Sequence, residues 1–468
     1  MKLSVKDFDF RVFPMNTRFP FQYGIASMTK LPHLFVSVDL EVNGTVSKGL
    51  ASEGLPPKWF TKNPDTTFEQ DLPAMRSVIG NAAKIASGFT GDCFFDLWQQ
   101  LYTAQAEWAA ENGHPPLLAN LGVSLIERTV LDGFCRGLEK PFSQALRDND
   151  LGIRPEEVDR RLKDISPASA LPEKPLKKII ARHTIGLGDP LTNDDIGEPL
   201  ADGLPYSLEE SIRAYGLRFF KIKICGDLDR DRERLSKIRT VLDKETGGDY
   251  HATFDGNEQF SNMDAFREHW EKYREDSAVE PLLGHIIFVE QPVHRDHALE
   301  AGVADGLRRW QEKPPLIIDE SDSEISSCRR AIDLGYNGTS HKNCKGVVKG
   351  VINAMRIGQC RRGGGEWILS GEDLANVGPV ALLQDLAVMA SLGIPHVERN
   401  GHHYFQGLSA FPGDMQNGVL ANHGDLYRKH DAGFPTLAIS DGAISVESVI
   451  GAPFGVDWTP DVSGFEAW

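Results

Sequence analysis

A series of single charged residues recurs at regular spacing through the middle of the chain, each at the end of a short apolar, strand-like run. Successive members lie between 23 and 35 residues apart, about the length of one strand, one loop and one helix. The members are Lys223, Asp255, Glu290, Asp319, Lys342 and Glu372. Such spacing is typical of a repeated strand–helix unit that presents one functional side chain at the same end of each strand.

The apolar runs number eight, and helical or loop segments separate them. They cover residues 178–187, 218–225, 250–256, 286–291, 315–320, 338–344, 366–371 and 395–399. Parallel strands of this number, joined by helices, close into an α/β (TIM) barrel, which we predict over residues 177–404. A doubly wound open sheet is the alternative, and the missing Gly-x-Gly-x-x-Gly after the first strand disfavours it.

The N-terminal part of the chain has a different pattern. Residues 3–13 and 33–52 alternate as strands, whereas helical spacing follows over residues 66–89, 92–112 and 117–148. We therefore predict an α+β domain over residues 1–148. An aromatic segment at 17–28 reads as a loop because Gly and Pro interrupt it.

Charge and cysteine content limit the possible partners. The formal net charge of −17 argues against nucleic acid or an anionic membrane surface as a partner. No apolar stretch approaches the ~20 residues that a bilayer crossing needs. The six cysteines form no CxxC pair, which is typical of reduced thiols, so we expect a cytoplasmic protein.

Three carboxylates end three consecutive predicted strands. Asp255, Glu290 and Asp319 would converge at the mouth of one barrel, where they repel one another unless a cation is present. Oxygen ligands without His or Cys select Mg²⁺, with Mn²⁺ as a possible substitute. Asn257, two residues after Asp255, shares its face of the strand.

Two lysines alternate with isoleucines on the second predicted barrel strand. Because Ile222 suits the outer face under the helices, Lys221 and Lys223 are predicted to point into the barrel. A pair of exposed edge-strand lysines is the alternative. Lys342 ends the sixth strand, which is opposite the second, so Lys223 and Lys342 would flank anything bound to the metal. Positive charge from Lys221 and the metal would make Lys223 a usable base.

Five short motifs in this order resemble the enolase superfamily. They are Lys-Ile-Lys, Asp-Gly-Asn, Val-Glu-Gln-Pro, Asp-Glu-Ser and Lys-Asn-Cys-Lys. Within the superfamily they resemble the muconate lactonizing enzyme-like subgroup of the mandelate racemase/muconate lactonizing enzyme family, and the resemblance covers nearly the whole chain. It implies that residues 1–148 are a capping domain and that residues 405–468 pack back on it.

The resemblance also implies the chemistry of the site. Asp255, Glu290 and Asp319 would bind Mg²⁺, Lys223 and Lys342 would act as acid and base, and Lys221 would lie beside the substrate carboxylate. The remaining candidates for substrate-binding or supporting roles are Asn257, Glu320, Lys345, Glu372, Glu398, Asn400, His402, Phe19 and Tyr23. The family's usual assemblies imply a homo-oligomer.

The implied reaction is removal of the proton next to a carboxylate, which gives an enediolate. Because both lysines are present, we expect an isomerase that racemises or epimerises a small carboxylic acid. The alternatives are a lyase that dehydrates acid sugars, a cycloisomerase, a Schiff-base barrel aldolase and a non-catalytic barrel. Glu398-Arg399-Asn400 lacks the Asp-x-Asp of dipeptide epimerases, which argues against a dipeptide substrate.

Overall fold

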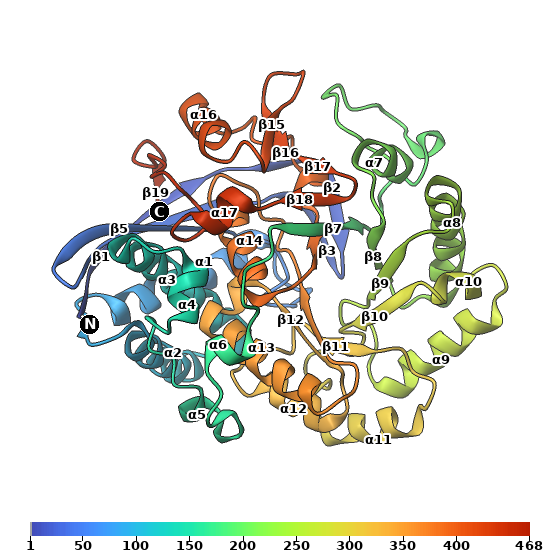
Figure 1. Ribbon diagram of the computed structural model, residues 1–468. Coiled ribbons are helices and arrows are strands. Elements are labelled where there is room, and N and C mark those ends of the chain that lie inside the picture. The colour runs from blue at the N-terminus through green and yellow to red at the C-terminus, as the bar shows by residue number, and fades with distance from the viewer. Residues whose placement is uncertain (1) are drawn as a thin grey trace.

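Eight parallel strands form a closed barrel in a computed structural model that describes residues 2–468 (Figure 1). The strands are β7 (Lys178–Ile185), β8 (Phe219–Lys223), β9 (His251–Asp255), β10 (Ile286–Glu290), β11 (Leu316–Ile318), β12 (Gly338–His341), β13 (Ile368–Gly371) and β14 (His396–Arg399). Pairing of β14 with β7, with Val397 opposite Ala181, closes the ring. The barrel prediction is therefore confirmed, and the open-sheet alternative is wrong.

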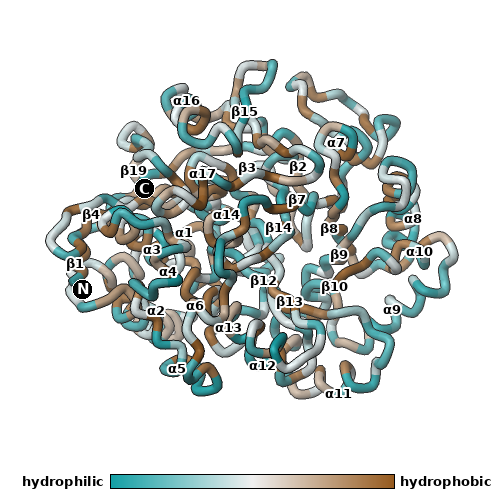
Figure 2. Tube along the Cα trace, viewed as in Figure 1, coloured by the Kyte–Doolittle hydropathy of each residue, from teal (hydrophilic) through white to brown (hydrophobic). Residues whose placement is uncertain are grey.

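Helices surround the barrel and bury the outer faces of its strands. They are α7 (Leu208–Tyr215), α8 (Leu228–Thr246), α9 (Met263–Glu275), α10 (Glu280–Leu283), α11 (Ala301–Arg309), α12 (Ser327–Leu334), α13 (Val347–Arg362) and α14 (Ala381–Leu392). Local sequence defines their ends: α8 begins after Asp227, which caps the Arg230 N–H, and ends at left-handed Gly247. In Figure 2, β10 is largely hydrophobic, whereas α8 and α9 are mostly hydrophilic.

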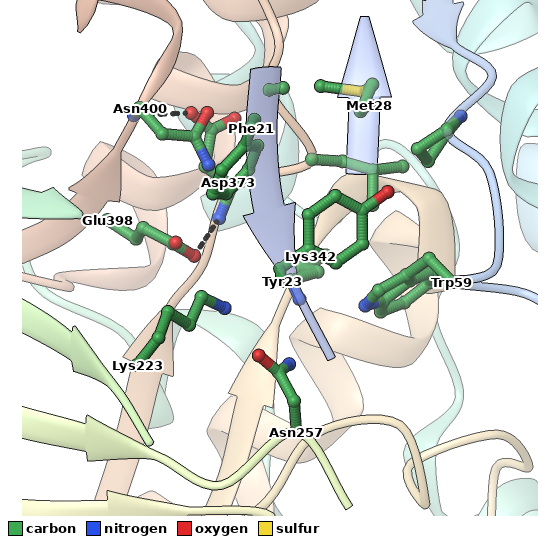
Figure 3. A pocket seen from close by; sticks show the side chains of 13 residues that line it. Phe21, Tyr23, Met28, Trp59, Lys223, Asn257, Lys342, Asp373, Glu398 and Asn400 are labelled. Atoms are coloured by element: carbon green, nitrogen blue, oxygen red, sulfur yellow. Dashed lines mark hydrogen bonds between the residues drawn. The ribbon is translucent and has the colours of Figure 1, made fainter. Parts of the chain in front are cut away.

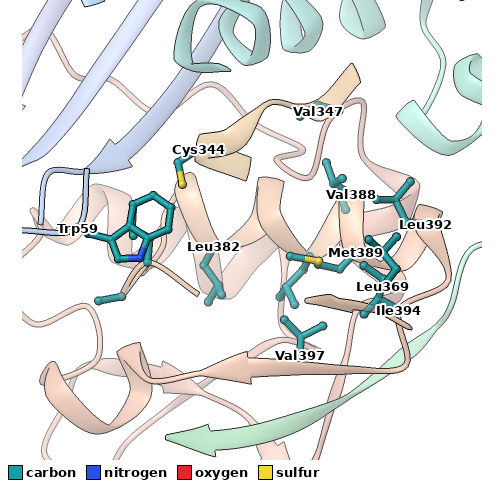
Figure 4. Close-up of a cluster of buried hydrophobic side chains, with 14 of the residues drawn as sticks. Trp59, Cys344, Val347, Leu369, Leu382, Val388, Met389, Leu392, Ile394 and Val397 are labelled. Atoms are coloured by element: carbon teal, nitrogen blue, oxygen red, sulfur yellow. The ribbon is translucent and has the colours of Figure 1, made fainter. Parts of the chain in front are cut away.

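One apolar layer joins the barrel wall to α14. Met389 of α14 and Val397 of β14 are buried and belong to one cluster of apolar side chains (Figure 4). Both approach Gly371 so closely that a Cβ there would lie 2.9 Å from each side chain. A larger residue at the end of β13 would therefore displace the helix or the strand that positions the next functional residue.

An antiparallel sheet and three long helices form the N-terminal part. The sheet contains β1 (Leu3–Phe13), β4 (His33–Val42) and β5 (Thr45–Gly54), with β6 (Thr90–Gly91) and β19 (Glu466–Ala467) paired to β1. The helices are α1 (Phe68–Ala86), α2 (Phe94–Glu111) and α3 (Pro116–Leu138). Helix α3 crosses β5 at Gly49, where a Cβ would lie 2.0 Å from the Thr129 carbonyl oxygen, so the crossing requires glycine.

Two local predictions were wrong. The segment predicted as a loop over 17–28 is a two-stranded hairpin, β2 (Asn16–Tyr23) and β3 (Ala26–Lys30). Its aromatic residues alternate with polar ones, and this period of two outweighs the Pro20 interruption. The helix predicted over 117–148 breaks at Glu139, which is left-handed with φ 53°, and continues as α4 (Phe142–Arg147).

The linking and C-terminal segments contain short elements. They are α5 (Pro155–Val158), η1 (Arg160–Leu162), α6 (Pro167–Ala170), η2 (Asn193–Asp195), η3 (Asn343–Lys345), α15 (Gly401–Tyr404), α16 (Gly413–Asn422), β15 (Tyr427–Lys429), β16 (Pro435–Leu437), β17 (Ile439–Ser440), β18 (Ala443–Ser445) and α17 (Glu447–Gly451). Strand β18 pairs with β7 of the barrel, whereas β19 pairs with β1. The three-part division of the chain stays a prediction. None of the helices in residues 2–468 combines the length and the apolar character that a membrane crossing requires.

Candidate active site

Lys221 lies at the centre of a group of carboxylates inside the barrel. It is fully buried, on β8. Its Nζ lies 2.9 Å from Asp255 Oδ2, 2.8 Å from Glu290 Oε2, 2.7 Å from Glu372 Oε2 and 3.0 Å from Glu398 Oε2. Burial acts to lower the pKa of Lys221, but these four carboxylates raise it well above its usual value. Lys221 is thus a charged ammonium that offsets part of the negative charge around it.

The two flanking lysines each pair with one of the predicted metal ligands. Lys223 Nζ lies 2.6 Å from Asp255 Oδ2, and Lys342 Nζ lies 2.6 Å from Asp319 Oδ2. Lys345 donates to Asp319 Oδ1 at 3.0 Å. Burial opposes ionisation of Asp319, but Lys342 and Lys345 hold its pKa well below the usual value. Burial likewise acts against the charged form of Lys342, and Asp319 raises the pKa of that lysine.

Glu290 differs from its two neighbours. It is fully buried, and neither of its carboxylate oxygens takes part in a hydrogen bond with the part of the chain that the structure describes. The 2.8 Å approach of Lys221 is close enough for an ion pair, but its direction is not that of a hydrogen bond. Burial, followed by repulsion from Glu372, raises the pKa of Glu290 well above its usual value. Glu290 therefore lies where an added cation would be most favourable.

Asp255, Glu290 and Asp319 have the oxygen ligands that the predicted metal ion needs, but their side chains are not grouped around a common point in this structure. In the described chain, residues 2–468, no three His, Cys, Asp or Glu side chains are grouped so that they could hold a metal ion. Lysine ammonium groups lie against Asp255 and Asp319 instead. The donor set is nevertheless all oxygen, from the ends of three adjacent strands, and both oxygens of Glu290 lack hydrogen-bond partners. These features suit Mg²⁺.

A cavity that is partly open to solvent lies over this group of charges, between the barrel and the β2–β3 hairpin (Figure 3). Its polar side comes from the barrel, and its apolar side comes mainly from the N-terminal part of the chain. The cavity is lined by Phe21, Tyr23, Met28, Pro56, Trp59, Lys223, Asn257, Lys342, Asp373, Leu374, Ala375, Glu398 and Asn400. Lys223 and Lys342 come from strands four positions apart in the eight-stranded ring, so they reach the cavity from opposite walls.

The structure brings together most of the residues predicted from sequence. Those that line the cavity are Lys223, Lys342, Asn257, Glu398, Asn400 and Tyr23, and those buried beneath it are Lys221, Asp255, Glu290, Asp319, Glu320, Lys345 and Glu372. Glu320 Oε1 accepts a hydrogen bond from Asn257. Phe19 and His402 do not line the cavity. Phe19 packs against Tyr206, and His402 Nε2 lies 3.0 Å from His183 Nδ1.

Several cavity residues escaped the sequence-based prediction. Trp59 and Pro56 precede the barrel by more than a hundred residues and carry no motif, so no sequence signal placed them there. Met28 ends the aromatic segment at 17–28, but the residue itself was not among the predicted site residues. Asp373 directly follows Glu372, at the end of a predicted strand, and this position was a usable signal. Its backbone N–H donates to Glu398 Oε2 at 3.1 Å, which orients the carboxylate of the neighbouring strand.

No protein-family model matches the chain, and neither does any curated protein. Solved structures do match. An enolase from Bradyrhizobium complexed with magnesium and mandelic acid is 13% identical, with 96% of this chain and 94% of that one covered and a TM-score of 0.60. The chain has the fold of the enolase superfamily. The resemblance inferred from the five motifs is thereby confirmed as a likeness of fold.

Two further structures with the enolase-superfamily fold have different reported ligands or activities. A muconate lactonizing enzyme from Pseudomonas fluorescens, complexed with muconolactone, is 15% identical, covers 99% of this chain and 96% of its own, and has a TM-score of 0.59. The L-Ala-D/L-Glu epimerase from Bacillus subtilis is 15% identical, with 94% of this chain and 99% of the epimerase covered, and has a TM-score of 0.56. One fold thus carries several reactions, so function has to be argued from the site.

Proposed function

We propose that this protein is a Mg²⁺-dependent enzyme that removes the proton next to the carboxylate of a small organic acid, and that it racemises or epimerises that acid. One observation carries the proposal. Lys223 and Lys342 reach the same cavity from opposite walls, and each touches a carboxylate of the all-oxygen group beneath it. An acid and a base on opposite faces of one carbon are what inversion at that carbon requires.

Asp255, Glu290 and Asp319 are the residues that would hold the metal ion. A Mg²⁺ ion held there would supply positive charge beside the substrate carboxylate. Lys221 adds a fixed positive charge from below, because it is buried and cannot turn toward solvent. The rings of Phe21 and Trp59 exclude water from above, which strengthens every charge interaction in the cavity. Lys223 and Lys342 move the proton.

The other outcomes on this fold start from the same proton abstraction. Loss of a hydroxyl after that step would make the protein an acid-sugar dehydratase, and ring closure would make it a cycloisomerase. The structurally similar muconate lactonizing enzyme is complexed with muconolactone, which keeps cycloisomerisation open. A Schiff-base aldolase is less well supported, because Lys221, Lys223 and Lys342 each lie against a carboxylate rather than free in the cavity. A non-catalytic barrel is also less well supported, because a binding protein has no need of Lys223, Lys342 and the three carboxylates together.

Location and assembly are further parts of the proposal. All six cysteines are free thiols, which suits the reducing cytoplasm. The cavity, with two lysines in its lining, suits a small-molecule carboxylate. Homo-oligomerisation rests on the superfamily resemblance alone.

The test is deuterium incorporation from D₂O into a pool of hydroxy acids, sugar acids and N-acyl amino acids, read by mass spectrometry with Mg²⁺ or EDTA. Exchange should require Mg²⁺ and should fall by a factor of about 10²–10⁴ in Lys223→Ala and in Lys342→Ala. Lys244→Ala is the matched control, since this lysine is 66% exposed in its side chain on α8. Loss of water from a product would indicate a dehydratase.

Two results would overturn the proposal. Exchange that persists in EDTA would exclude the metal-dependent step. Covalent trapping of a substrate on a lysine by borohydride would instead indicate a Schiff-base enzyme.

A further inference from the structure

A second cleft, open to solvent, lies between the segment that leads into α7 and the β15–β16 hairpin, both near the top of Figure 1. Its lining shares no residue with that of the active-site cavity. We propose that this cleft binds a small phosphorylated polyol and that the bound ligand stabilises the β2–β3 hairpin. This inference goes beyond the proposed function and does not depend on it.

The β15–β16 hairpin supplies one wall of the cleft. Arg428 of β15 lies directly opposite Thr436 of β16 in the antiparallel pairing, so the two side chains share one face of the hairpin. Both residues line the cleft. Lys429, the next residue along β15, is exposed and does not line the cleft, because alternation along a strand turns its side chain to the other face.

Arg428 is a cation without a counter-charge from the protein. It is exposed, and within residues 2–468 its guanidinium forms neither an ion pair nor a hydrogen bond. Arg213, on the opposite wall, differs because Glu209 and Glu245 lie 2.9 and 2.5 Å from its Nη2. The whole chain has a net charge of −17, so an unpaired guanidinium in a cleft is the exception. It is the group with which an anionic ligand would pair.

His430 adds a hydrogen-bond donor to the same wall. Its Nδ1 accepts from the Ala432 N–H at 3.2 Å, so the ring proton is on Nε2. The ring stacks on Phe434, and a Cβ at Gly203 would lie 3.1 Å from His430 Cε1. The Cε1–Nε2 edge therefore faces the opposite wall of the cleft. The guanidinium, this imidazole N–H and the Thr436 hydroxyl match the three terminal oxygens of a phosphate ester better than the two oxygens of a carboxylate.

The wall on the α7 side suits hydroxyl groups. Tyr215 is 7% exposed, and its hydroxyl forms no hydrogen bond within residues 2–468. Burial raises the pKa of Tyr215, so this hydroxyl stays protonated and can donate. Glu210 Oε2 accepts from the backbone N–H groups of Tyr206 and Ser207, at 2.9 and 3.5 Å, which leaves Oε1 as an acceptor. A donor and an acceptor match the hydroxyls of a polyol, and the Glu210 charge disfavours a phosphate at this end.

The α7-side wall is also attached to the β2–β3 hairpin. Arg18 of β2 donates to the carbonyls of Leu204 and Pro205, at 3.1 Å each, and pairs with Asp202. Leu204 and Pro205 line the cleft. A ligand that contacts this segment favours the same arrangement as Arg18 does. Binding should therefore make opening of the hairpin less frequent.

The first experiment measures binding of glucitol 6-phosphate to the full chain by calorimetry. EDTA is present, so that no divalent metal carries the phosphate into the active-site cavity. Glucitol and inorganic phosphate should each bind about tenfold more weakly or less, because each contacts only one wall. Arg428→Gln should weaken binding of the phosphate ester about tenfold or more, the size expected for a hydrogen bond between charged groups.

Lys429→Gln is the matched control, because it removes the same charge from the other face of β15. Its affinity for glucitol 6-phosphate should stay within about twofold of the wild-type value. An equal loss of affinity in Arg428→Gln and Lys429→Gln would overturn the site, since it would indicate general charge attraction. No binding by the wild type would also overturn it, and equally tight binding of inorganic phosphate would contradict the polyol assignment.

Amide hydrogen exchange tests the link to the β2–β3 hairpin. Saturating glucitol 6-phosphate should slow exchange at residues 16–30 by a factor of about five or more in the wild type and in Lys429→Gln. At the same ligand concentration, Arg428→Gln should show less slowing. Unchanged exchange in the liganded wild type would overturn the link. Neither experiment uses the proposed reaction, so their outcomes leave the proposed function to its own test.

Discussion

The Nζ atom of Lys342 lies 4.5 Å from the centroid of the Trp59 ring and 2.6 Å from Asp319 Oδ2. Lys342 follows barrel strand β12, whereas Trp59 follows β5 of the N-terminal sheet. An indole ring on one side and a carboxylate on the other fix the position of the ammonium group. The N-terminal part of the chain therefore helps to position a proposed acid/base residue of the barrel.

Trp59→Leu should weaken this arrangement without opening a large hole. A cation–π contact of this kind is worth about 0.5–2 kcal/mol, so kcat/KM for the exchange reaction should fall by a factor of about 2–30. Trp108→Leu, in α2 and away from the cavity, should leave kcat/KM unchanged. An unaltered kcat/KM in Trp59→Leu would mean that the ring does not position Lys342.

Removal of Lys221 should destabilise the protein when no divalent metal is present. Four carboxylates lie within 3.0 Å of its Nζ, and Lys221→Met would leave them buried without that ammonium. We expect a loss of about 3–5 kcal/mol in the free energy of unfolding, measured in urea with EDTA. Lys244→Met is the exposed control.

Magnesium should stabilise Lys221→Met more than it stabilises the wild type. The variant offers the metal ion a group of carboxylates whose charge is no longer offset by Lys221, and binding to the folded state raises stability by mass action. Equal Mg²⁺-dependent stabilisation of both proteins would show that Lys221 and the metal do not share these carboxylates.

The position of the β2–β3 hairpin should depend on Arg18. Its guanidinium, 3% exposed, donates five hydrogen bonds, two of them to Asp202 at 2.5 and 2.9 Å. The others go to the carbonyls of Leu204, Pro205 and His403, at 3.1, 3.1 and 2.7 Å. These contacts hold the hairpin against the segment that follows β7 and against α15.

Arg18→Met should therefore loosen the hairpin. Buried hydrogen bonds to a charged group contribute about 1.5–3 kcal/mol, so hydrogen exchange at the amides of residues 16–30 should speed up by a factor of about 10–100. The same variant should raise KM, because the hairpin carries Phe21 and Tyr23 into the cavity. Arg11→Met is the control, since the Arg11 side chain pairs with Asp9 at the surface. Unchanged exchange rates would contradict the role assigned to Arg18.

The barrel could be predicted from sequence because its strands are buried on both faces and appear as continuous apolar runs. The charged residue that ends each run then had to lie at one edge of the sheet, as Asp255 and Glu290 do. The convergence on Lys221 could not be predicted in this way. This convergence depends on how far the side chains of Glu372 and Glu398 extend toward Lys221 inside the barrel. The alternation of residues along β8 shows only which face Lys221 points to.

The apolar side of the cavity was not predictable for a related reason. Trp59 reaches Lys342 only because the N-terminal sheet docks on the barrel, and docking depends on shape rather than on local pattern. The β2–β3 hairpin was predictable in principle. Phe19, Phe21 and Tyr23 alternate with a period of two, but Pro20 drew the interpretation toward a loop.

Three histidines near α15, of which His183 and His403 are buried and His402 is half-buried, should make the protein sensitive to acid. His183 Nδ1 lies 3.0 Å from His402 Nε2, and His403 Nε2 lies 3.7 Å from Asp189 Oδ2. Burial lowers the pKa of His183 to about 3. Burial, followed by the charges of His183 and nearby arginines including Arg18, lowers the pKa values of His402 and His403 well below the usual value. All three are therefore neutral in the folded protein.

A histidine with a lowered pKa makes the folded state less stable in acid. The unfolded chain binds a proton as pH falls through about 6.5, whereas the folded protein does not until its own lower pKa is reached. The contribution of these histidines to the free energy of unfolding is thus fully present above about pH 6.5 and is lost as the pH decreases further. For His183 alone, the loss between about pH 7 and 5 is about 2 kcal/mol. His183→Asn should remove that part of the pH dependence, measured as the urea unfolding free energy at both pH values. His297→Asn, at an exposed position on the loop after β10, should leave the pH dependence as it is in the wild type. If His183→Asn loses as much stability on acidification as the wild type does, His183 is not one of the groups that take up a proton on unfolding.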